Sequence, residues 1–248
     1  MVNAKDRIIV PLDVNTPAAV RDLVHLLKDD VGMFKVGLEL IHSLGPQVVD
    51  MILDLGGQVM YDPKLADIPT TVGKAMHCIA ARNVKLCTVF VPSSLDSITV
   101  AVQNRGDVQV IGVTALTTMD DDACGASYNM TAIQSVLRFA DQAKLAGCQG
   151  IVCSPQELAM IRSSPTLKDL LLITPGVRPK WASANDQKRI MTHDEAIRDG
   201  ADYLVIGRPI TSPPANIGSP VAAAQLIASE MQVVFNQRAR SATKGVQP

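Results

Sequence analysis

The stretch Asp62-Pro63-Lys64-Leu65-Ala66-Asp67-Ile68-Pro69-Thr70-Thr71 decides how the rest of the chain is interpreted. It follows the apolar, strand-like run Val59-Met60-Tyr61. Alternation along an extended segment puts Asp62 and Lys64 on one face. Asp67 falls beyond the strand, in the loop. Charged groups of alternating sign therefore gather at the C-terminal end of one strand. An ordinary salt bridge gives the same pattern, so its meaning depends on where this strand falls in the chain.

Length and composition favour a single α/β barrel. The chain has 248 residues, which is the typical length of one (β/α)8 barrel, although two small domains also fit that length. Hydrophobic residues make up 47% of the chain and aromatic residues only 3%. This balance suits an aliphatic α/β interior better than an all-β one.

Charge and local composition exclude several classes of protein. The formal net charge is −1 and no long basic run occurs, so nucleic-acid binding has no electrostatic support. The longest apolar stretches have the length of strands, so no transmembrane helix is predicted. The first residues, Met1 to Lys5, lack the apolar core of a signal peptide, and we expect a cytoplasmic protein. The cysteines are odd in number and form no CxxC pair, which predicts reduced, mostly buried thiols.

Short apolar runs alternate with helical segments along the whole chain. The predicted strands cover residues 7–13, 33–37, 58–64, 85–91, 108–114, 150–154, 170–174 and 203–207. The predicted helices cover about 17–29, 47–55, 69–82, 93–104, 131–146, a short segment from 155, 192–199 and 220–237. Residues 116–128 are predicted to be a polar loop whose acidic run, Asp120 to Asp122, is solvated.

This order predicts one (β/α)8 TIM barrel. The domain is residues 1–248, with the barrel at about 7–237 and a frayed C-terminal tail at 238–248. A doubly wound sheet needs a glycine-rich first turn of the dinucleotide-binding kind, and Asp13-Val14-Asn15-Thr16 is not one.

Charged residues recur where the first three strands end. Asp13 ends the first, Lys35 lies late in the second, and Asp62 and Lys64 end the third. In such barrels the reacting groups lie at the C-terminal ends of the strands. A structural salt-bridge cluster is the alternative. Because buried ion pairs are poor sources of stability, a functional charge network is the better interpretation.

A phosphate site is predicted after the last two strands. The loops after strands seven and eight are the usual phosphate cradle of this fold. Gly207 lets a backbone N–H approach an anion, and Arg208 supplies a forked cation, although a surface arginine paired with an aspartate is the alternative for Arg208. The long polar loop that follows strand seven, at about 178–190, is predicted to be a lid, or else a plain solvated loop. It carries Trp181, Ser183, Asn185, Asp186 and Gln187.

No metal site is predicted. The histidines lie on separate predicted helices or caps with no paired spacing: His25, His42, His77 and His193. Asp13 and Asp62 are able to hold magnesium, but Lys64 would compete with the cation. The residues therefore favour metal-free chemistry.

The opening stretch resembles the D-x-K-x-x-D-I-P-x-T signature of the orotidine 5′-monophosphate decarboxylase family. Leu12-Asp13, residues 34–37, Thr174-Pro175-Gly176-Val177-Arg178-Pro179 and residues 206–211 are similar to the family's other landmarks, in the same order. Related sugar-phosphate lyases share D-x-K-x-x-D alone. The Ile68-Pro69 continuation and the run from Thr174 to Pro179 favour the nucleotide enzyme.

The resemblance implies a carbon–carbon lyase of pyrimidine biosynthesis that converts orotidine 5′-monophosphate (OMP) to UMP and CO2 without a cofactor. Asp13 and Lys35 would hold the ribose hydroxyls, with Lys35 also in the charge network. Asp62 would face the substrate carboxylate, and Lys64 would deliver a proton to C6 of the pyrimidine. Physical chemistry agrees, because the carbanion left by CO2 has no carbonyl placed to delocalise it and needs a nearby cation.

The resemblance also implies a homodimer and the remaining contacts to substrate. The residues expected in the partner subunit's site are Asp67, Ile68 and Thr71. Thr117 would contact the pyrimidine edge. The residues expected at the 5′-phosphate are Arg178, Gln187, Gly207 and Arg208.

Two segments depart from the family pattern. Residues 90–94, Phe-Val-Pro-Ser-Ser, replace a His-Ala-x-Gly-Gly-like stretch, which puts the local backbone in doubt. Pro63 replaces an aliphatic residue and removes a ladder donor, so we expect weakened strand pairing there. The competing hypotheses are a magnesium-dependent sugar-phosphate decarboxylase or aldol synthase and a catalytically silent phosphate-binding barrel.

Overall fold

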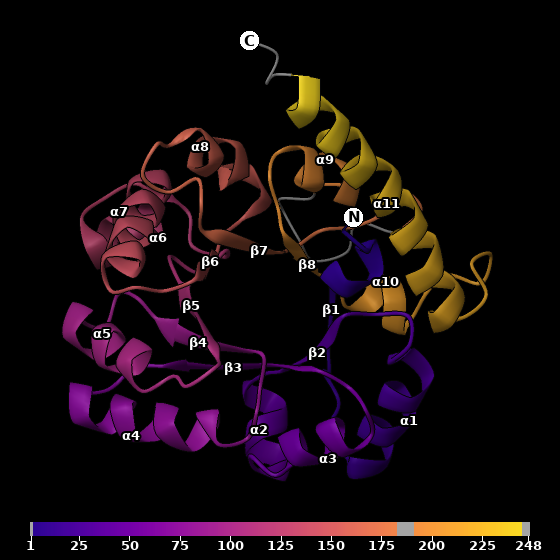
Figure 1. The fold of residues 1–248 in the computed structure, drawn as a ribbon, viewed down its shortest axis with the longest axis horizontal. Coiled ribbons are helices and arrows are strands. Elements are labelled where there is room, and N and C mark those ends of the chain that lie inside the picture. The colour runs from indigo at the N-terminus through magenta and orange to yellow at the C-terminus, as the bar shows by residue number, and fades with distance from the viewer. Residues whose placement is uncertain (1, 183–190, 245–248) are drawn as a thin grey trace.

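The chain folds around a closed ring of eight parallel strands, in which each strand pairs with the next and β8 returns to pair with β1. The computed structural model describes residues 2–182 and 191–244, with side chains described as far as residue 239. The helices lie outside the ring, as Figure 1 shows. The predicted (β/α)8 barrel is therefore confirmed.

The strands are short and mostly buried on both faces, as expected of a parallel sheet covered by helices. Each begins and ends within two residues of its predicted run. Their bounds are β1 (Ile8–Pro11), β2 (Met33–Val36), β3 (Val59–Leu65), β4 (Leu86–Phe90), β5 (Gln109–Val113), β6 (Gly150–Val152), β7 (Leu171–Pro175) and β8 (Tyr203–Val205).

Several helices begin at a residue whose side chain caps the first free N–H groups, among them α1, α5, α6, α7 and α9. Thr16, for example, accepts a hydrogen bond from the backbone N–H of Ala19. The bounds are η1 (Ala4–Arg7), α1 (Pro17–Leu27), α2 (Leu38–Leu44), α3 (Val48–Asp54), α4 (Pro69–Ala80), α5 (Leu95–Gln103), α6 (Asp121–Tyr128), α7 (Ala132–Leu145), η2 (Pro155–Glu157), α8 (Leu158–Ser163), α9 (His193–Arg198), α10 (Arg208–Thr211) and α11 (Pro220–Lys244).

The prediction of a polar loop over residues 116–128 is wrong, because helix α6 occupies most of it. Asp120 is its N-cap and accepts from the N–H of Ala123 at 3.0 Å. Asp121, in its first turn, accepts from the N–H of Ala132 at 2.8 Å. Acidic side chains stabilise the positive end of a helix, so this exposed run caps α6 and links it to α7.

The predicted fraying from residue 238 is also wrong as far as the structure describes the tail, because α11 continues to Lys244. Arg238 anchors this last part of the helix. Its guanidinium donates to the backbone oxygens of Ile197 at 2.9 Å and Ala201 at 3.3 Å. The short helices α2 and α10 were not predicted either.

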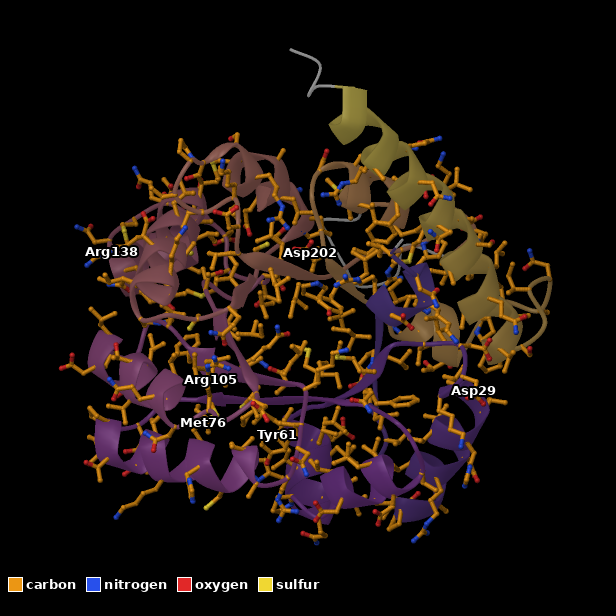
Figure 2. All side chains as sticks on the ribbon, viewed as in Figure 1. Asp29, Tyr61, Met76, Arg105, Arg138 and Asp202 are labelled. Atoms are coloured by element: carbon orange, nitrogen blue, oxygen red, sulfur yellow. The ribbon has the colours of Figure 1, made fainter. Side chains whose placement is uncertain are left out.

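The apolar core has two parts. A small cluster fills the inside of the barrel: Ile9, Met33, Met60, Leu86, Ile111, Ile173 and Tyr203. A larger one lies between the outer face of the sheet and the helices and includes Tyr61, with Leu65 packed against it. Side chains accordingly fill both the centre of the ring and the layer around it in Figure 2.

The N-terminal residues lie against α11, beside the closing strands. The side chain of Gln232, on α11, accepts from the N–H of Ala4 at 2.9 Å and donates to the backbone oxygen of Val2 at 3.0 Å. The Arg7 guanidinium lies 4.8 Å from the centre of the Tyr203 ring, which joins β1 to β8. These contacts fix the first residues against the last helix.

The cysteines are free, as predicted, and only Cys78 is exposed. The buried ones are Cys87, Cys124, Cys148 and Cys153. Across the described helices, none combines the length and apolar character needed to cross a membrane.

Candidate active site

A polar layer lies on top of the apolar layer inside the barrel. Alternate residues of a strand share a face, so the residue two positions after an inward-facing one also faces inward. Met33, Met60 and Leu86 belong to the inner apolar cluster. Two positions further on stand Lys35 on β2, Asp62 on β3 and Thr88 on β4. Three neighbouring strands therefore present a cation, an anion and a hydroxyl at one level of the barrel.

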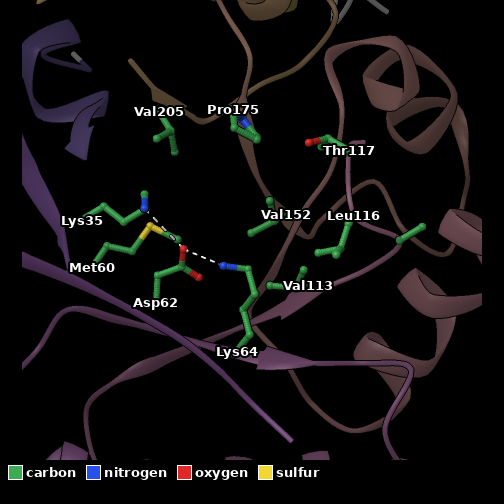
Figure 3. Close-up of a pocket in the computed structure, with 11 residues that line it drawn as sticks. Lys35, Met60, Asp62, Lys64, Val113, Leu116, Thr117, Val152, Pro175 and Val205 are labelled. Atoms are coloured by element: carbon green, nitrogen blue, oxygen red, sulfur yellow. Dashed lines mark hydrogen bonds and ion pairs between the residues drawn. The ribbon is translucent and has the colours of Figure 1, made fainter. Parts of the chain in front are cut away.

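Asp62 lies between two ammonium groups. Its Oδ2 atom is 2.9 Å from the Nζ of Lys64 and 3.6 Å from the Nζ of Lys35. The two lysines approach the carboxylate from opposite sides, as Figure 3 shows. The side chain of Asp62 is 10% exposed, that of Lys35 17% and that of Lys64 32%. Three of the four charges of the predicted network thus meet, and Lys64 is the most accessible of the three.

A bulge at the end of β3 shapes this arrangement. The register with β4 shifts between Tyr61 and Leu65, and Lys64 has a φ of +51°. A left-handed conformation costs a residue with a Cβ about 1–2 kcal/mol. Pro63 brings no N–H to the ladder, so the predicted weakening of the strand pairing is confirmed. Asp62 and Lys64 still meet, as alternation predicts, although the backbone between them is irregular.

The Thr88 hydroxyl connects both residues to β4. It donates to Oδ1 of Asp62 at 2.8 Å and accepts from the backbone N–H of Lys64 at 3.0 Å. Sequence reasoning missed Thr88, because a threonine within an apolar strand resembles an ordinary core residue. The available signal was its place in the inward-facing alternation, two positions after Leu86.

A cavity of about 230 Å³ opens above the charged residues at the C-terminal ends of the strands. Its polar lining is Lys35, Asp62, Lys64 and Thr117. The rest of the lining is apolar and includes Met60, Val113, Ala115, Leu116, Val152, Pro175 and Val205. A planar apolar ring with polar edges matches such a lining, since a few polar groups then fix its orientation.

Of two further predicted substrate-binding residues, Thr117 lines this cavity and Asp13 does not. Thr117 is exposed, follows β5 and lines the cavity. Asp13 is exposed in the loop after β1 and makes no ion pair within the described parts of the chain. The expected four-charge network therefore contains three charges here, and Asp13 stays outside it.

A second cavity, of about 250 Å³, lies beside the loops that follow β7 and β8. It is lined by Arg178, Trp181, Ala182, Arg208, Pro209, Ser212 and Pro214. Two guanidinium groups on an open cavity suit a phosphate, because each presents a fork of donors. The predicted phosphate residues Arg178 and Arg208 thus line one hollow, and Gly207 immediately precedes Arg208.

Gly207 allows close packing of the ends of β8 and β1. A Cβ at this position would lie 3.1 Å from the Cγ of Pro11. The segment after β7 is held at both ends by a bridge between Val177 and Met191, and the N–H of Arg178 donates to the Met191 oxygen at 3.0 Å. Gln187 and most of the predicted lid lie outside the described residues.

The residues predicted to serve a partner subunit are exposed. Asp67 and Thr71 are exposed, and Ile68 is 66% exposed. The backbone oxygen of Asp67 accepts from the Ser97 hydroxyl at 2.6 Å, which ties this loop to α5. None of the three residues lines the cavity of its own chain.

Burial shifts the pKa of a cysteine on β4 and of a histidine on α9. It raises the pKa of the Cys87 thiol far above its ordinary value, and the charge of Asp62 adds to the effect. Cys87 is therefore a neutral thiol beside the site. Burial also lowers the pKa of His193, against the opposing effect of Asp194 and Glu230. No group of three or more potential metal ligands occurs among the residues that the structure describes.

Residues 90–94, which depart from the family pattern, connect β4 to α5. Phe90 ends the strand, and the Ser94 side chain accepts from the N–H of Ser97 as the N-cap of α5. The departure therefore leaves the β4–α5 connection short and capped, next to the Asp67 loop.

The chain matches the family model described as Orotidine 5'-phosphate decarboxylase / HUMPS family over residues 6–227. It is 41% identical over 244 residues to the orotidine 5'-phosphate decarboxylase of Moorella thermoacetica, with 94% of this chain and 95% of that protein covered. It is 42% identical over 236 residues to the Geotalea daltonii protein of the same name, with coverages of 92% and 97%. The crystal structure of orotidine 5'-phosphate decarboxylase from Lactobacillus acidophilus aligns with a TM-score of 0.78 at 27% identity, covering 90% of this chain and 98% of that one.

Proposed function

Because the chain belongs to the orotidine 5'-phosphate decarboxylase / HUMPS family, we propose that it decarboxylates OMP to UMP and CO2. One observation carries the proposal beyond family membership. A carboxylate stands between two ammonium groups at the floor of a largely apolar cavity. That arrangement suits a reaction which develops negative charge on a planar ring.

Lys64 is the proposed proton donor. Departure of CO2 leaves a carbanion at C6, and no carbonyl of the ring is placed to delocalise its charge. An ammonium group that lies ready at this point stabilises the charge and then transfers a proton. Lys64 is the most exposed member of the cluster, and its Nζ borders the cavity. This chemistry needs no cofactor.

Asp62 and Lys35 have supporting roles. Asp62 holds the Lys64 ammonium and faces the departing carboxylate of the substrate, where two anions repel each other until CO2 leaves. Lys35 lies on the other side of Asp62 and balances its charge. Lys35 and Asp13, at the ends of β2 and β1, are proposed to bind the ribose hydroxyls, with Thr117 at the pyrimidine edge.

Phosphate binding supplies the energy that orients the substrate. Arg178 and Arg208 line the second cavity, after β7 and β8, and this is the usual position of a phosphate in this fold. Binding energy from a remote phosphate lowers the barrier when it is used to hold the reacting ring in place. Gln187 is proposed as a further phosphate ligand, and Gly207 as a backbone donor.

A second copy of the chain completes the proposed site. Asp67, Ile68 and Thr71 project from the loop after β3 and the start of α4 without entering their own cavity. A large aliphatic side chain as exposed as Ile68 is suited to an interface. We propose a homodimer in which each loop contributes these residues to its partner's site.

The test is decarboxylation of OMP by the Lys64→Ala variant, followed by loss of absorbance near the orotate band. The rate should fall by several powers of ten with UMP binding retained. Lys168→Ala is the matched control, because Lys168 is exposed just before β7, at the opposite end of the barrel. Near-normal turnover of Lys64→Ala would refute its role as proton donor.

A chelator separates this function from the magnesium-dependent alternative. A magnesium-dependent sugar-phosphate lyase of the same family would lose its activity when the metal is removed. Turnover of OMP should be indifferent to the chelator. A protein that binds UMP but turns over neither OMP nor a sugar phosphate would be a catalytically silent phosphate-binding barrel.

A further inference from the structure

We infer that Thr88 is a positioning residue of the active site, which fixes the Asp62 carboxylate and the Lys64 backbone with a single hydroxyl. The inference rests on the proposed decarboxylase function and deepens it. Thr88 acts through these two residues, from a position that is fully buried on β4.

Both hydrogen-bonding functions of the Thr88 hydroxyl are directed at the charged cluster. The hydroxyl has one hydrogen to donate, and it donates that hydrogen to Oδ1 of Asp62 at 2.8 Å. The same oxygen accepts from the backbone N–H of Lys64 at 3.0 Å. One atom therefore links the acid and the proposed proton donor to a neighbouring strand.

The first bond sets the orientation of the carboxylate. Rotation of an aspartate carboxylate about its last torsion is loosely restrained by the side chain itself. With Oδ1 held by Thr88, Oδ2 is the oxygen left to meet Lys64 at 2.9 Å and Lys35 at 3.6 Å. Without the hydroxyl, nothing described in the structure holds Oδ1 on the β4 side, and the carboxylate is free to turn between the two ammonium groups.

The second bond supports an unfavourable backbone. Tyr61 pairs with Cys87 and Leu65 with Val89, so the bulged residues of β3 face Thr88 alone. Pro63 has no N–H, and Lys64 has a φ of +51°. A left-handed residue with a Cβ persists only where its surroundings hold it. The side chain of Thr88 takes the N–H of Lys64, where a regular ladder would use a backbone carbonyl.

Thr114 offers a comparison, because its buried hydroxyl bonds only to the backbone. Thr114 is also fully buried and lies one residue beyond β5, the next strand after β4. Its hydroxyl donates to the backbone oxygen of Val152 at 3.0 Å and makes no contact with the charged cluster. Thr114→Val therefore removes a buried hydroxyl and a hydrogen bond of similar length without touching Asp62 or Lys64, which makes it a matched control.

The experiment compares Thr88→Val, Thr88→Ser and Thr114→Val in the decarboxylation of OMP. Thr88→Val keeps the shape of the side chain and removes the hydroxyl. Because small displacements of a reacting group are costly, kcat should fall by about 10- to 100-fold, with KM and UMP binding nearly unchanged. Thr88→Ser retains the hydroxyl and should recover most of kcat, and Thr114→Val should resemble the wild type.

A crystal structure of Thr88→Val gives a readout that does not depend on activity. We expect Asp62 to turn away from Lys64 or Lys64 to leave its left-handed conformation. Retention of both features together with wild-type kcat would overturn the inference. Should Thr88→Val fail to fold, Thr88→Cys carries the kinetic test, since a thiol of similar size is only a weak donor.

The outcomes distinguish this inference from the proposed function. If the wild type does not decarboxylate OMP, the proposed function fails, and the Thr88→Val structure still decides whether Thr88 fixes the cluster. If the wild type is active and Thr88→Val matches it, only the role of Thr88 is refuted. Equal losses in Thr88→Val and Thr88→Ser would also refute it, because the hydroxyl would then not be the group that matters.

Discussion

Replacing Asp62 by asparagine should weaken the folded protein as well as its chemistry. Asparagine has nearly the same shape and keeps an oxygen for the Thr88 hydroxyl, but it removes the charge that Lys35 and Lys64 both contact. Two ammonium groups then face a neutral amide. Lys64→Ala removes only one contact and leaves the Lys35–Asp62 pair in place.

The expected magnitude follows from the burial of the three side chains. Removing one partner of a buried ion pair costs about 3–5 kcal/mol. Asp62 and Lys35 are 10% and 17% exposed, but Lys64 is 32% exposed and water screens part of its charge. We therefore expect Asp62→Asn to lose about 2 kcal/mol of unfolding free energy, and Lys64→Ala about 1 kcal/mol or less. For a chain of this length, the larger loss lowers Tm by about 4–8 °C.

Urea unfolding followed by far-ultraviolet circular dichroism measures both losses on the same scale. Asp50→Asn is the control, since Asp50 pairs with Arg82 on the surface and its side chain is 49% exposed. An exposed pair of this kind should contribute less than about 1 kcal/mol. An Asp62→Asn protein as stable as the wild type, or more stable than Lys64→Ala, would refute the idea that this carboxylate holds two partly buried cations.

Three further predictions concern other parts of the molecule. Arg208→Ala should raise KM for OMP and weaken UMP binding, with little effect on a nucleoside that lacks the phosphate; an unchanged KM would contradict the phosphate assignment. Burial lowers the pKa of His193 below its ordinary 6.5, so the unfolded chain takes up the proton first as pH falls. The contribution of neutral His193 to the free energy of unfolding is fully present above about pH 6.5 and is lost as the pH falls toward the pKa of the folded state. Unfolding at a series of pH values should therefore show that His193→Gln loses less stability in acid than the wild type does. A chromogenic thiol reagent should titrate Cys78 in the folded chain and the remaining cysteines only after unfolding, because they are buried and burial raises the pKa of Cys148 to about 12.

Most of the fold was predictable because buried parallel strands have a simple signature. Short apolar runs separated by capped helices placed every strand within two residues of its position. The two incorrect predictions, the polar loop and the frayed tail, each have a physical cause. The acids around Asp120 resemble a solvated loop until Ala123 and Ala132 are seen to donate to them. The last turns of α11 are held by Arg238, whose acceptors lie some 40 residues away in sequence and leave no local pattern.

The charged site was predictable in composition but not in geometry. Alternation indicated that Asp62 and Lys64 share a face, and both border the cavity. No pattern in the sequence gives the left-handed conformation of Lys64 or the shift in register that accompanies it. The backbone N–H of Lys64 donates to the Thr88 hydroxyl on the neighbouring strand, and a contact between two strands leaves no pattern within either segment.

The pairing of β1 with β8 has a consequence for the order in which the protein is made. Ile8 and Ile9 pair with Leu204 and Val205, so the first strand to leave the ribosome cannot complete its pairing until the last strand has been made. Until then the growing sheet has two free edges that are able to pair with other chains. Protection by chaperones should therefore matter most before residue 205 emerges, and nascent chains stalled before that point should aggregate more readily than those released after α11.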